Sequence, residues 1–177
     1  MFGLDSVVFR PHNVYGIRQN TGDRYRNVIG IFMNQLLQNQ PCSIFGDGEQ
    51  TRAFTHVSEV APVIARCVDV PAAMNQVFNI GADKPTTVNR LAEVVQEAMG
   101  KKTGVVHLPP RKEVVHAFSD HSKVSKVFGH TKPVTLEEGI REMAEWVKKV
   151  GPRKSSVFQG IEVERNLPPS WRAAATS

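Results

Sequence analysis

Cysteine is scarce in this sequence, which has two cysteines, Cys42 and Cys67, among its 177 residues. They lie far apart and match neither a CxxC motif nor a zinc-ligand spacing. The six histidines are scattered, and they form no HxH or HExxH pair of the kind that binds zinc. We therefore expect two reduced, partly buried thiols, no metal site and a reducing, cytosolic setting.

Long hydrophobic runs are also missing. No apolar stretch approaches the roughly 20 residues that a helix needs to cross a membrane. The sequence opens MFGLD, without the basic segment and the apolar segment that make a secretory signal peptide. These absences predict a cytoplasmic protein with no membrane partner.

Dense clusters of basic residues are lacking too, although the formal net charge is +5 and the sequence pI is about 9.4. The closest basic runs are pairs, namely Lys101-Lys102, Arg111-Lys112 and Lys148-Lys149. No stripe of Lys and Arg alternates with aromatic residues, so nucleic acid is not an expected partner. A small phosphorylated ligand or a solvated basic surface accounts for the mild positive balance.

What is present is the composition of an ordinary globular domain, with 41% hydrophobic and 22% charged residues. The β-branched run at residues 6–10 predicts a strand that is buried on both faces, as in a parallel sheet. A parallel strand needs neighbours, and the sequence supplies few obvious ones. We therefore expect that other strands of this sheet are missing.

Strand and helix patterns alternate along the rest of the chain. We predict a loop over 11–23, strands over 43–45, 51–57, 76–80 and 105–108, and helices over 24–38, 60–70, 87–99 and 122–128. Glycines at 46 and 48 indicate a hairpin-type turn between the first two of these strands. Ser58 is the expected N-cap of the second helix.

A last helix is predicted to begin at Thr135, which forms a capping box with Glu138. It ends at Gly151 and carries its apolar residues on one face, namely Ile140, Met143, Ala144 and Val147. The pattern fades after this helix. We predict one portion over residues 1–151 and an extended tail over 152–177, with Trp171 as the docking point of the tail.

Three clusters carry chemistry. The first, RPHNVYG at residues 10–16, directly follows the opening strand, where ligands of open α/β sheets bind. The second, IFGDGEQTRAF at 44–54, places Arg52 after a glycine-rich turn, and arginine suits bidentate recognition of phosphate. The third, PPRKE at 109–113, places Arg111 in a stiff loop. Taken singly, each has an ordinary alternative: a turn in which Asn13 bonds its own backbone, a surface arginine, and solvated charge.

Taken together and in this order, these clusters, with VFNIGADKPTT and a distal LEEGI helix, resemble the C-terminal half of extended short-chain dehydrogenases/reductases. This is the family of NAD-dependent epimerases and dehydratases, and the sequence is most similar to its UDP-glucose 4-epimerases over residues 5–149. The resemblance implies an α/β fold: the substrate-binding part of an extended Rossmann-type fold, with the N-terminal dinucleotide-binding sheet largely missing.

The resemblance also implies which residues meet the diphosphate and the cofactor. Asn13 matches the asparagine that touches the sugar-nucleotide diphosphate, and Arg52 matches the arginine that clamps it. Arg111 matches a second phosphate-binding arginine. Pro11 and His12 match residues near the nicotinamide of NAD.

The nucleoside is assigned in the same way. Asn27 and Val28 match an asparagine-apolar pair that opens a helix and binds the nucleotide. Ser43 and Phe45 match residues that cradle the uracil, and a phenyl ring suits contact with a flat base. Glu113 matches an acidic residue that holds the ribose hydroxyls.

Two local features depart from the family pattern. Ala53 stands where the family has an aspartate directly after the clamp arginine, so the hydrogen bonds of that aspartate are lost. The loop Arg111-Lys112-Glu113 is one residue shorter than the usual arginine-x-glycine-acid loop. The shorter loop changes the register of Arg111 and Glu113.

The catalytic signature of the family is missing as well. Gln19 lies four residues after Tyr15 and Ile29 four after Tyr25, so there is no Tyr-x-x-x-Lys pair for acid/base catalysis. No glycine-rich turn is present to seat the NAD pyrophosphate. We therefore predict a fragment with no catalytic residue, inactive alone, whose NAD binds only in the complete enzyme.

The resemblance leaves several functions open. The expected ligand is a UDP-sugar, and the expected protein partner is a missing N-terminal half or a second copy in a homodimer. The complete enzyme is a UDP-glucose 4-epimerase by resemblance, with UDP-glucuronate decarboxylase and dTDP-glucose 4,6-dehydratase as alternatives. A non-catalytic nucleotide-sugar-binding module and a structural fragment are further alternatives.

Overall fold

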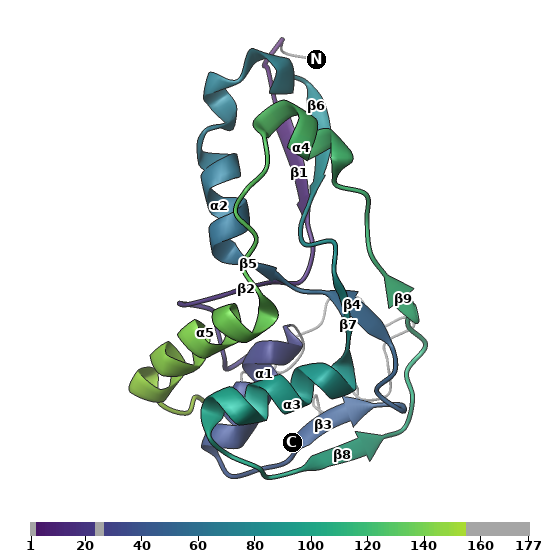
Figure 1. Cartoon of the computed structure of the whole chain (residues 1–177), viewed down its shortest axis with the longest axis vertical. Coiled ribbons are helices and arrows are strands. Elements are labelled where there is room, and N and C mark those ends of the chain that lie inside the picture. Colours follow the sequence, from purple (N-terminus) through teal and green to yellow (C-terminus); the bar gives the residue numbers. More distant parts are fainter. Residues whose placement is uncertain (1–2, 24–26, 155–177) are drawn as a thin grey trace.

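Two parallel strands and two helices form one of the two hydrophobic cores in the computed structural model, which describes residues 3–23 and 27–154. The strands are β1 (Val7–Pro11) and β6 (Gln76–Ile80), and the helices are α2 (Val57–Ala65) and α4 (Ser122–Phe128). Figure 1 shows the two helices packed beside the strand pair. Phe78 is fully buried, and its ring contacts those of Phe9 and Phe128. An aromatic cluster therefore holds the strands against α4.

The opening strand is confirmed, but the prediction that it is buried on both faces is wrong. Val8 lies opposite Val77 in the parallel register, and their side chains are 46% and 39% exposed. Side chains alternate between the two faces of a strand, so the helices cover the Phe9 face and leave the Val8 face open. Parallel sheets are usually covered on both faces.

The second core lies below the first in Figure 1. Three helices pack together there, namely α1 (Val28–Leu37), α3 (Val88–Met99) and α5 (Leu136–Val150). Beside them, β3 (Cys42–Phe45) pairs in parallel with β8 (Val105–Leu108). The fully buried side chains include Phe32 of α1, Leu91 of α3 and Met143 of α5, so each helix contributes its apolar face to one core.

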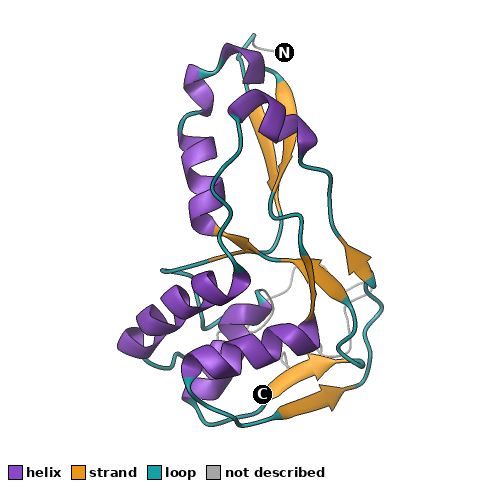
Figure 2. Cartoon of the chain, viewed as in Figure 1, coloured by secondary structure: helices purple, strands orange, loops and turns teal. Residues whose placement is uncertain are grey.

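Short strands connect the two cores, as the strand colours of Figure 2 show. The pair of β2 (Val14–Tyr15) and β5 (Thr55–His56) is parallel. A three-stranded sheet has β4 (Thr51–Ala53) in its centre, with β7 (Pro85–Thr87) antiparallel on one side and β9 (His116–Ala117) parallel on the other. Two 3-10 turns, Cys67–Asp69 and Pro71–Ala73, follow α2.

The predicted hairpin over residues 46–48 is wrong. Gly46 and Gly48 do adopt positive φ values of 76° and 80°, the backbone region that glycine enters at no cost. The turn, however, carries the chain from one sheet to another. β3 pairs with β8, and β4 pairs with β7 and β9. The glycines therefore marked a real turn whose flanking strands do not pair with each other.

The strand predicted over 51–57 is interrupted. It divides into β4 and β5, because the Thr55 amide donates to the Asn13 carbonyl at 3.2 Å. β5 therefore pairs with β2 and does not continue in the sheet that contains β4. The loop predicted over 11–23 accordingly contains β2. The helix begins at Val57, with His56 and not Ser58 as its N-cap, and it ends at Ala65.

Other helix limits follow the sequence closely. The Thr87 hydroxyl caps α3, which ends at Gly100 with φ of 68°. Thr135 and Glu138 form the predicted capping box of α5, whose buried face is the predicted one. After α5, the side chain of Asn34 holds the backbone of Arg153 through two hydrogen bonds of 3.0 and 2.9 Å. The predicted docking point Trp171 lies outside the described residues.

Both cysteines are free, as expected. No helix in the described ranges is long and apolar enough to cross a membrane. Across the same ranges, no group of three or more His, Cys, Asp and Glu side chains could hold a metal ion.

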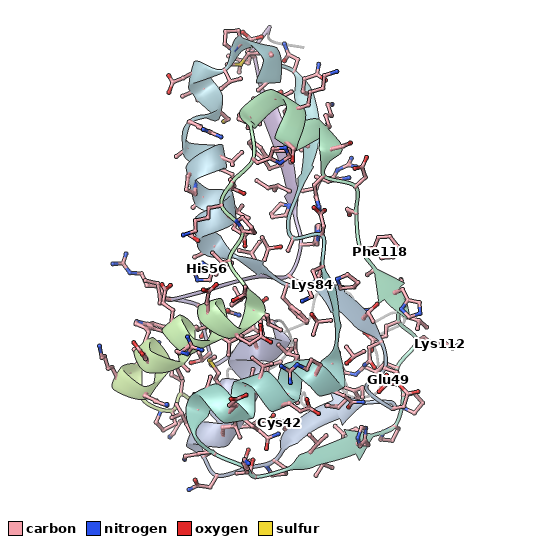
Figure 3. All side chains as sticks on the ribbon, viewed as in Figure 1. Cys42, Glu49, His56, Lys84, Lys112 and Phe118 are labelled. Atoms are coloured by element: carbon pink, nitrogen blue, oxygen red, sulfur yellow. The ribbon has the colours of Figure 1, made fainter. Side chains whose placement is uncertain are left out.

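Cys42, labelled in Figure 3, is fully buried, whereas Cys67 is partly exposed. Burial raises the pKa of the Cys42 thiol to about 12, and the thiolate is the reactive form. At pH 8 we therefore expect iodoacetamide to alkylate Cys67 alone, with Cys42 reacting after denaturation. Mass spectrometry of the wild type and of Cys67→Ala measures this directly. Rapid alkylation of the folded Cys67→Ala chain would contradict the burial of Cys42.

Candidate functional site

A cavity of about 730 Å³ lies between α1, β3, β4 and the loop that follows β8. This volume is in the range of small-molecule sites. Eight of the ten residues predicted as site residues line it. They are Asn13, Asn27, Val28, Ser43, Phe45, Arg52, Arg111 and Glu113. They come from separate stretches of the chain, and the fold brings them to one place.

Arg52 of β4 is held in a fixed orientation on one wall of the cavity. Its Nη1 donates to the carbonyls of Thr51 and Val115 at 2.8 and 3.1 Å. Its Nη2 donates to Glu113 Oε2 at 3.0 Å. Backbone carbonyls thus orient the guanidinium group, which lowers the entropy cost of using it to bind a ligand.

Arg111 lies against the aromatic ring of Phe45. Its Cζ atom is 3.3 Å from the centroid of the ring, a close cation–π contact. Desolvation by burial lowers the pKa of Arg111. The guanidinium group thus lies over one face of the Phe45 ring, and a planar cation in this position suits a phosphate or a flat base.

Ser43, on the same strand as Phe45, is fixed by a residue that the sequence analysis did not identify. Gln35 of α1 donates from Nε2 to Ser43 Oγ at 3.0 Å and accepts from the Ser43 amide at 3.2 Å. The Ser43 hydroxyl accepts one bond here and keeps its own hydrogen to donate. Gln35 also lines the cavity. A glutamine inside an apolar helical stripe was the available signal for it.

The N-terminal end of α1 borders the cavity through Asn27 and Val28. Asn27 is the N-cap and has a left-handed conformation with φ of 62°, which asparagine tolerates better than most residues. The first turn of α1 carries no acidic side chain. The amides of this first turn and the helix dipole therefore favour an anion at this end of the cavity.

Asn13 completes the cavity wall at the end of β1. Its Nδ2 donates to the Ala53 carbonyl at 3.1 Å, so the side chain bonds another segment and not its own backbone. Ala53 is fully buried at this contact. The small side chain that departs from the family pattern thus allows the Asn13 loop and β4 to pack closely.

Pro11 and His12 do not line this cavity. The His12 ring stacks on that of His121 with centroids 4.9 Å apart, and His121 Nδ1 lies 2.6 Å from Asp83 Oδ1. Desolvation by burial lowers the pKa of His12, and the nearby His121 lowers it further. Sequence reasoning missed this His12–His121–Asp83 cluster, because nothing in the spacing of these residues indicates that they meet.

The residues present do not form a complete dinucleotide site. A dinucleotide cradle joins a parallel strand to a helix through a glycine-rich turn. Within residues 3–23 and 27–154, α2 follows the parallel strand β5 and α4 follows the parallel strand β9, in both cases without a glycine between strand and helix. The segment between the parallel strand β2 and α1 carries two widely separated glycines, Gly16 and Gly22. We therefore derive no step through NAD from this chain.

Comparison with known proteins identifies relatives of the chain. Residues 1–81 match the NAD dependent epimerase/dehydratase family. The chain is 32% identical over 148 residues to a putative UDP-glucose 4-epimerase of Methanocaldococcus jannaschii, covering 84% of this chain and 47% of the relative. It is 27% identical to a UDP-N-acetyl-alpha-D-glucosaminuronate decarboxylase of Bacillus cytotoxicus, covering 84% of this chain and 48% of the relative.

Among solved structures, the chain resembles the UDP-glucose 4-epimerase of Thermotoga maritima with UDP-glucose. The TM-score is 0.76 at 35% identity, over 84% of this chain and 48% of that one. The mixed α/β fold is thus that of Rossmann-like epimerases. The chain spans about half the length of the curated relatives it matches.

Proposed function

We propose that this chain, a member of the NAD dependent epimerase/dehydratase family, is the substrate-binding part of a nucleotide-sugar epimerase of the UDP-glucose 4-epimerase type. The ligand is a UDP-sugar. The carrying observation is the convergence of eight residues, predicted from the sequence as substrate contacts, on one cavity of about 730 Å³.

The chemistry of the cavity wall suits each part of such a ligand. Arg52, Arg111 and the amino end of α1 offer positive charge to a diphosphate. The Phe45 ring and the Arg111 guanidinium group that lies over it offer flat groups to a base, and the Ser43 hydroxyl offers a hydrogen bond to the edge of that base. The sugar then extends past Asn13 toward the end of β1.

In a complete enzyme of this type, NAD would supply the hydride chemistry at C4 of the sugar when bound. The residues of this chain bind the nucleotide and orient the sugar, and the acid/base group belongs to a part of the family fold that these residues do not include. Because the chain spans about half of its relatives, we propose that it is inactive alone.

Two other functions are alternatives to an epimerase. A decarboxylase or a dehydratase of the same family uses the same kind of substrate cavity, and the Bacillus cytotoxicus relative is a decarboxylase. A self-sufficient binding module is less well supported. Such a module would need a covered β1–β6 sheet, whereas Val8 and Val77 leave one face of this pair open to solvent.

Calorimetric titration of the chain tests the proposal. We expect saturable binding of UDP, weaker binding of dTDP, whose deoxyribose lacks one hydroxyl for Glu113, and no binding of NAD. Tighter binding of dTDP than of UDP would favour the dehydratase alternative. A folded chain that binds NAD but neither nucleoside diphosphate would contradict the proposed function.

A further inference from the structure

Side chains of both charges line the cavity. Among the described residues, the ionisable ones are the cations Arg52 and Arg111 and the anions Asp23 and Glu113. The two carboxylates weaken the positive field that a diphosphate meets at the two arginines. A ligand with two negative charges must therefore gain part of its affinity from contacts that form after it enters.

The Glu113 carboxylate occupies one of the strongest of these contacts. Its Oε2 accepts from Arg52 Nη2 at 3.0 Å, and its Oε1 lies 3.5 Å from the side-chain nitrogen Nε2 of Gln50. The Arg52 side chain is 17% exposed and that of Glu113 is 41% exposed. The arginine is thus fixed in the wall, whereas the carboxylate reaches it from the solvent side.

The carboxylate belongs to a loop that contributes Arg111 and Glu113 to the lining of the cavity. Residues 109–115 connect β8 to β9 without regular structure, and Figure 3 shows this stretch, marked by Lys112, at the outer edge of the molecule near Glu49. Two of its side chains reach back to the cavity: Arg111 to the ring of Phe45, and Glu113 to Arg52. Two of the residues that attach the loop to the site are therefore residues that a nucleotide would contact.

We propose that Glu113 is an internal competitor for the anionic part of the ligand, and that it determines how strongly the site prefers dianionic phosphates. In the free chain its carboxylate takes the position at Arg52 that a phosphate oxygen takes in the complex. A dianion displaces it, because two phosphate charges interact with Arg52 and Arg111 together. A neutral nucleoside or a monoanion lacks the charge to do so. This inference rests on the proposed function, since it concerns the same site.

The test measures binding of inorganic pyrophosphate and of UDP to the wild type, to Glu113→Gln and to a matched control, Glu49→Gln. Glu49 is a nearby acid that accepts from Asn89 Nδ2 and makes no contact with Arg52 among the described residues. Both substitutions remove one negative charge, and only the first frees Arg52. Thermal unfolding of each variant checks that the fold is kept.

We expect Glu113→Gln to bind pyrophosphate about fivefold more tightly than the wild type, as expected for the loss of one partly exposed ion pair, and Glu49→Gln to change affinity less than twofold. Unchanged or weaker pyrophosphate binding by Glu113→Gln, with UDP binding by the wild type, overturns the competitor role and leaves the proposed function standing. A wild type without UDP affinity, together with tighter pyrophosphate binding by Glu113→Gln, overturns the proposed function alone. Failure of every chain to bind either ligand overturns both.

Discussion

Replacing Arg52 with alanine is expected to weaken UDP binding about 100-fold, the order of loss seen when one partner of a hydrogen-bonded charge pair is removed from an interface. The guanidinium group is held by the carbonyls of Thr51 and Val115 and lies on the cavity wall. Its removal deletes a fixed cation and leaves Glu113 in the cavity without its partner. The remaining negative charge then repels the diphosphate.

Lysine at position 52 is the matched comparison. It keeps the positive charge but lacks the planar, forked donors that reach two carbonyls and an oxyanion at once. We expect Arg52→Lys to fall between the wild type and Arg52→Ala, with affinities measured by calorimetry and folding checked by circular dichroism. Equal UDP affinity in the wild type and in a folded Arg52→Ala chain would refute the assignment of Arg52 as the diphosphate clamp.

Local patterns in the sequence predicted the parts of the fold that depend on local forces. The helices α3 and α5 were found with their caps, because Thr87, Gly100 and Thr135 satisfy the backbone groups at helix ends. The apolar face of α5 was also predicted correctly, because the period of 3.6 residues in a helix places its buried residues in one stripe.

Pairing between strands was not predictable in this way. The partner of β3 is β8, with Cys42 opposite Val105, and no short-range signal links segments so far apart. The break between β4 and β5 was missed because its cause, the hydrogen bond from Thr55 to the Asn13 carbonyl, joins distant parts of the chain. Tertiary contacts of this kind override local strand propensity.

The candidate site, like the fold, was predicted only in part. The site residues were selected because their motifs, in this order, resemble those of NAD-dependent epimerases and dehydratases, and eight of them lie around one cavity. The partners that orient them were not visible. Gln35 and Ser43, or Asp83 and His121, meet only because their helices and loops pack together.

Alanine at Gly139 is expected to cost about 2 kcal/mol of folding free energy, through overpacking of the junction between α5 and the short strands. A Cβ atom there would lie 2.9 Å from Tyr15 Cζ and 3.0 Å from His56 Cδ2, and closer still to Tyr15 Oη. Both neighbouring rings are buried, and burial raises the pKa of Tyr15.

Helix propensity opposes this cost, because alanine in a helix is about 1 kcal/mol more favourable than glycine. The Gly30→Ala variant measures this gain in helix propensity by itself. Gly30 lies inside α1, and a Cβ atom there would meet the flexible Gln19 amide at 3.3 Å. We expect Gly30→Ala to be neutral or slightly stabilising and Gly139→Ala to lower the melting temperature by about 4–8 °C. Adding Tyr15→Phe should restore part of the loss in Gly139→Ala, since it removes the nearest clashing atom. If the two glycine variants melted at the same temperature, close packing of α5 against Tyr15 would not be what requires glycine at position 139.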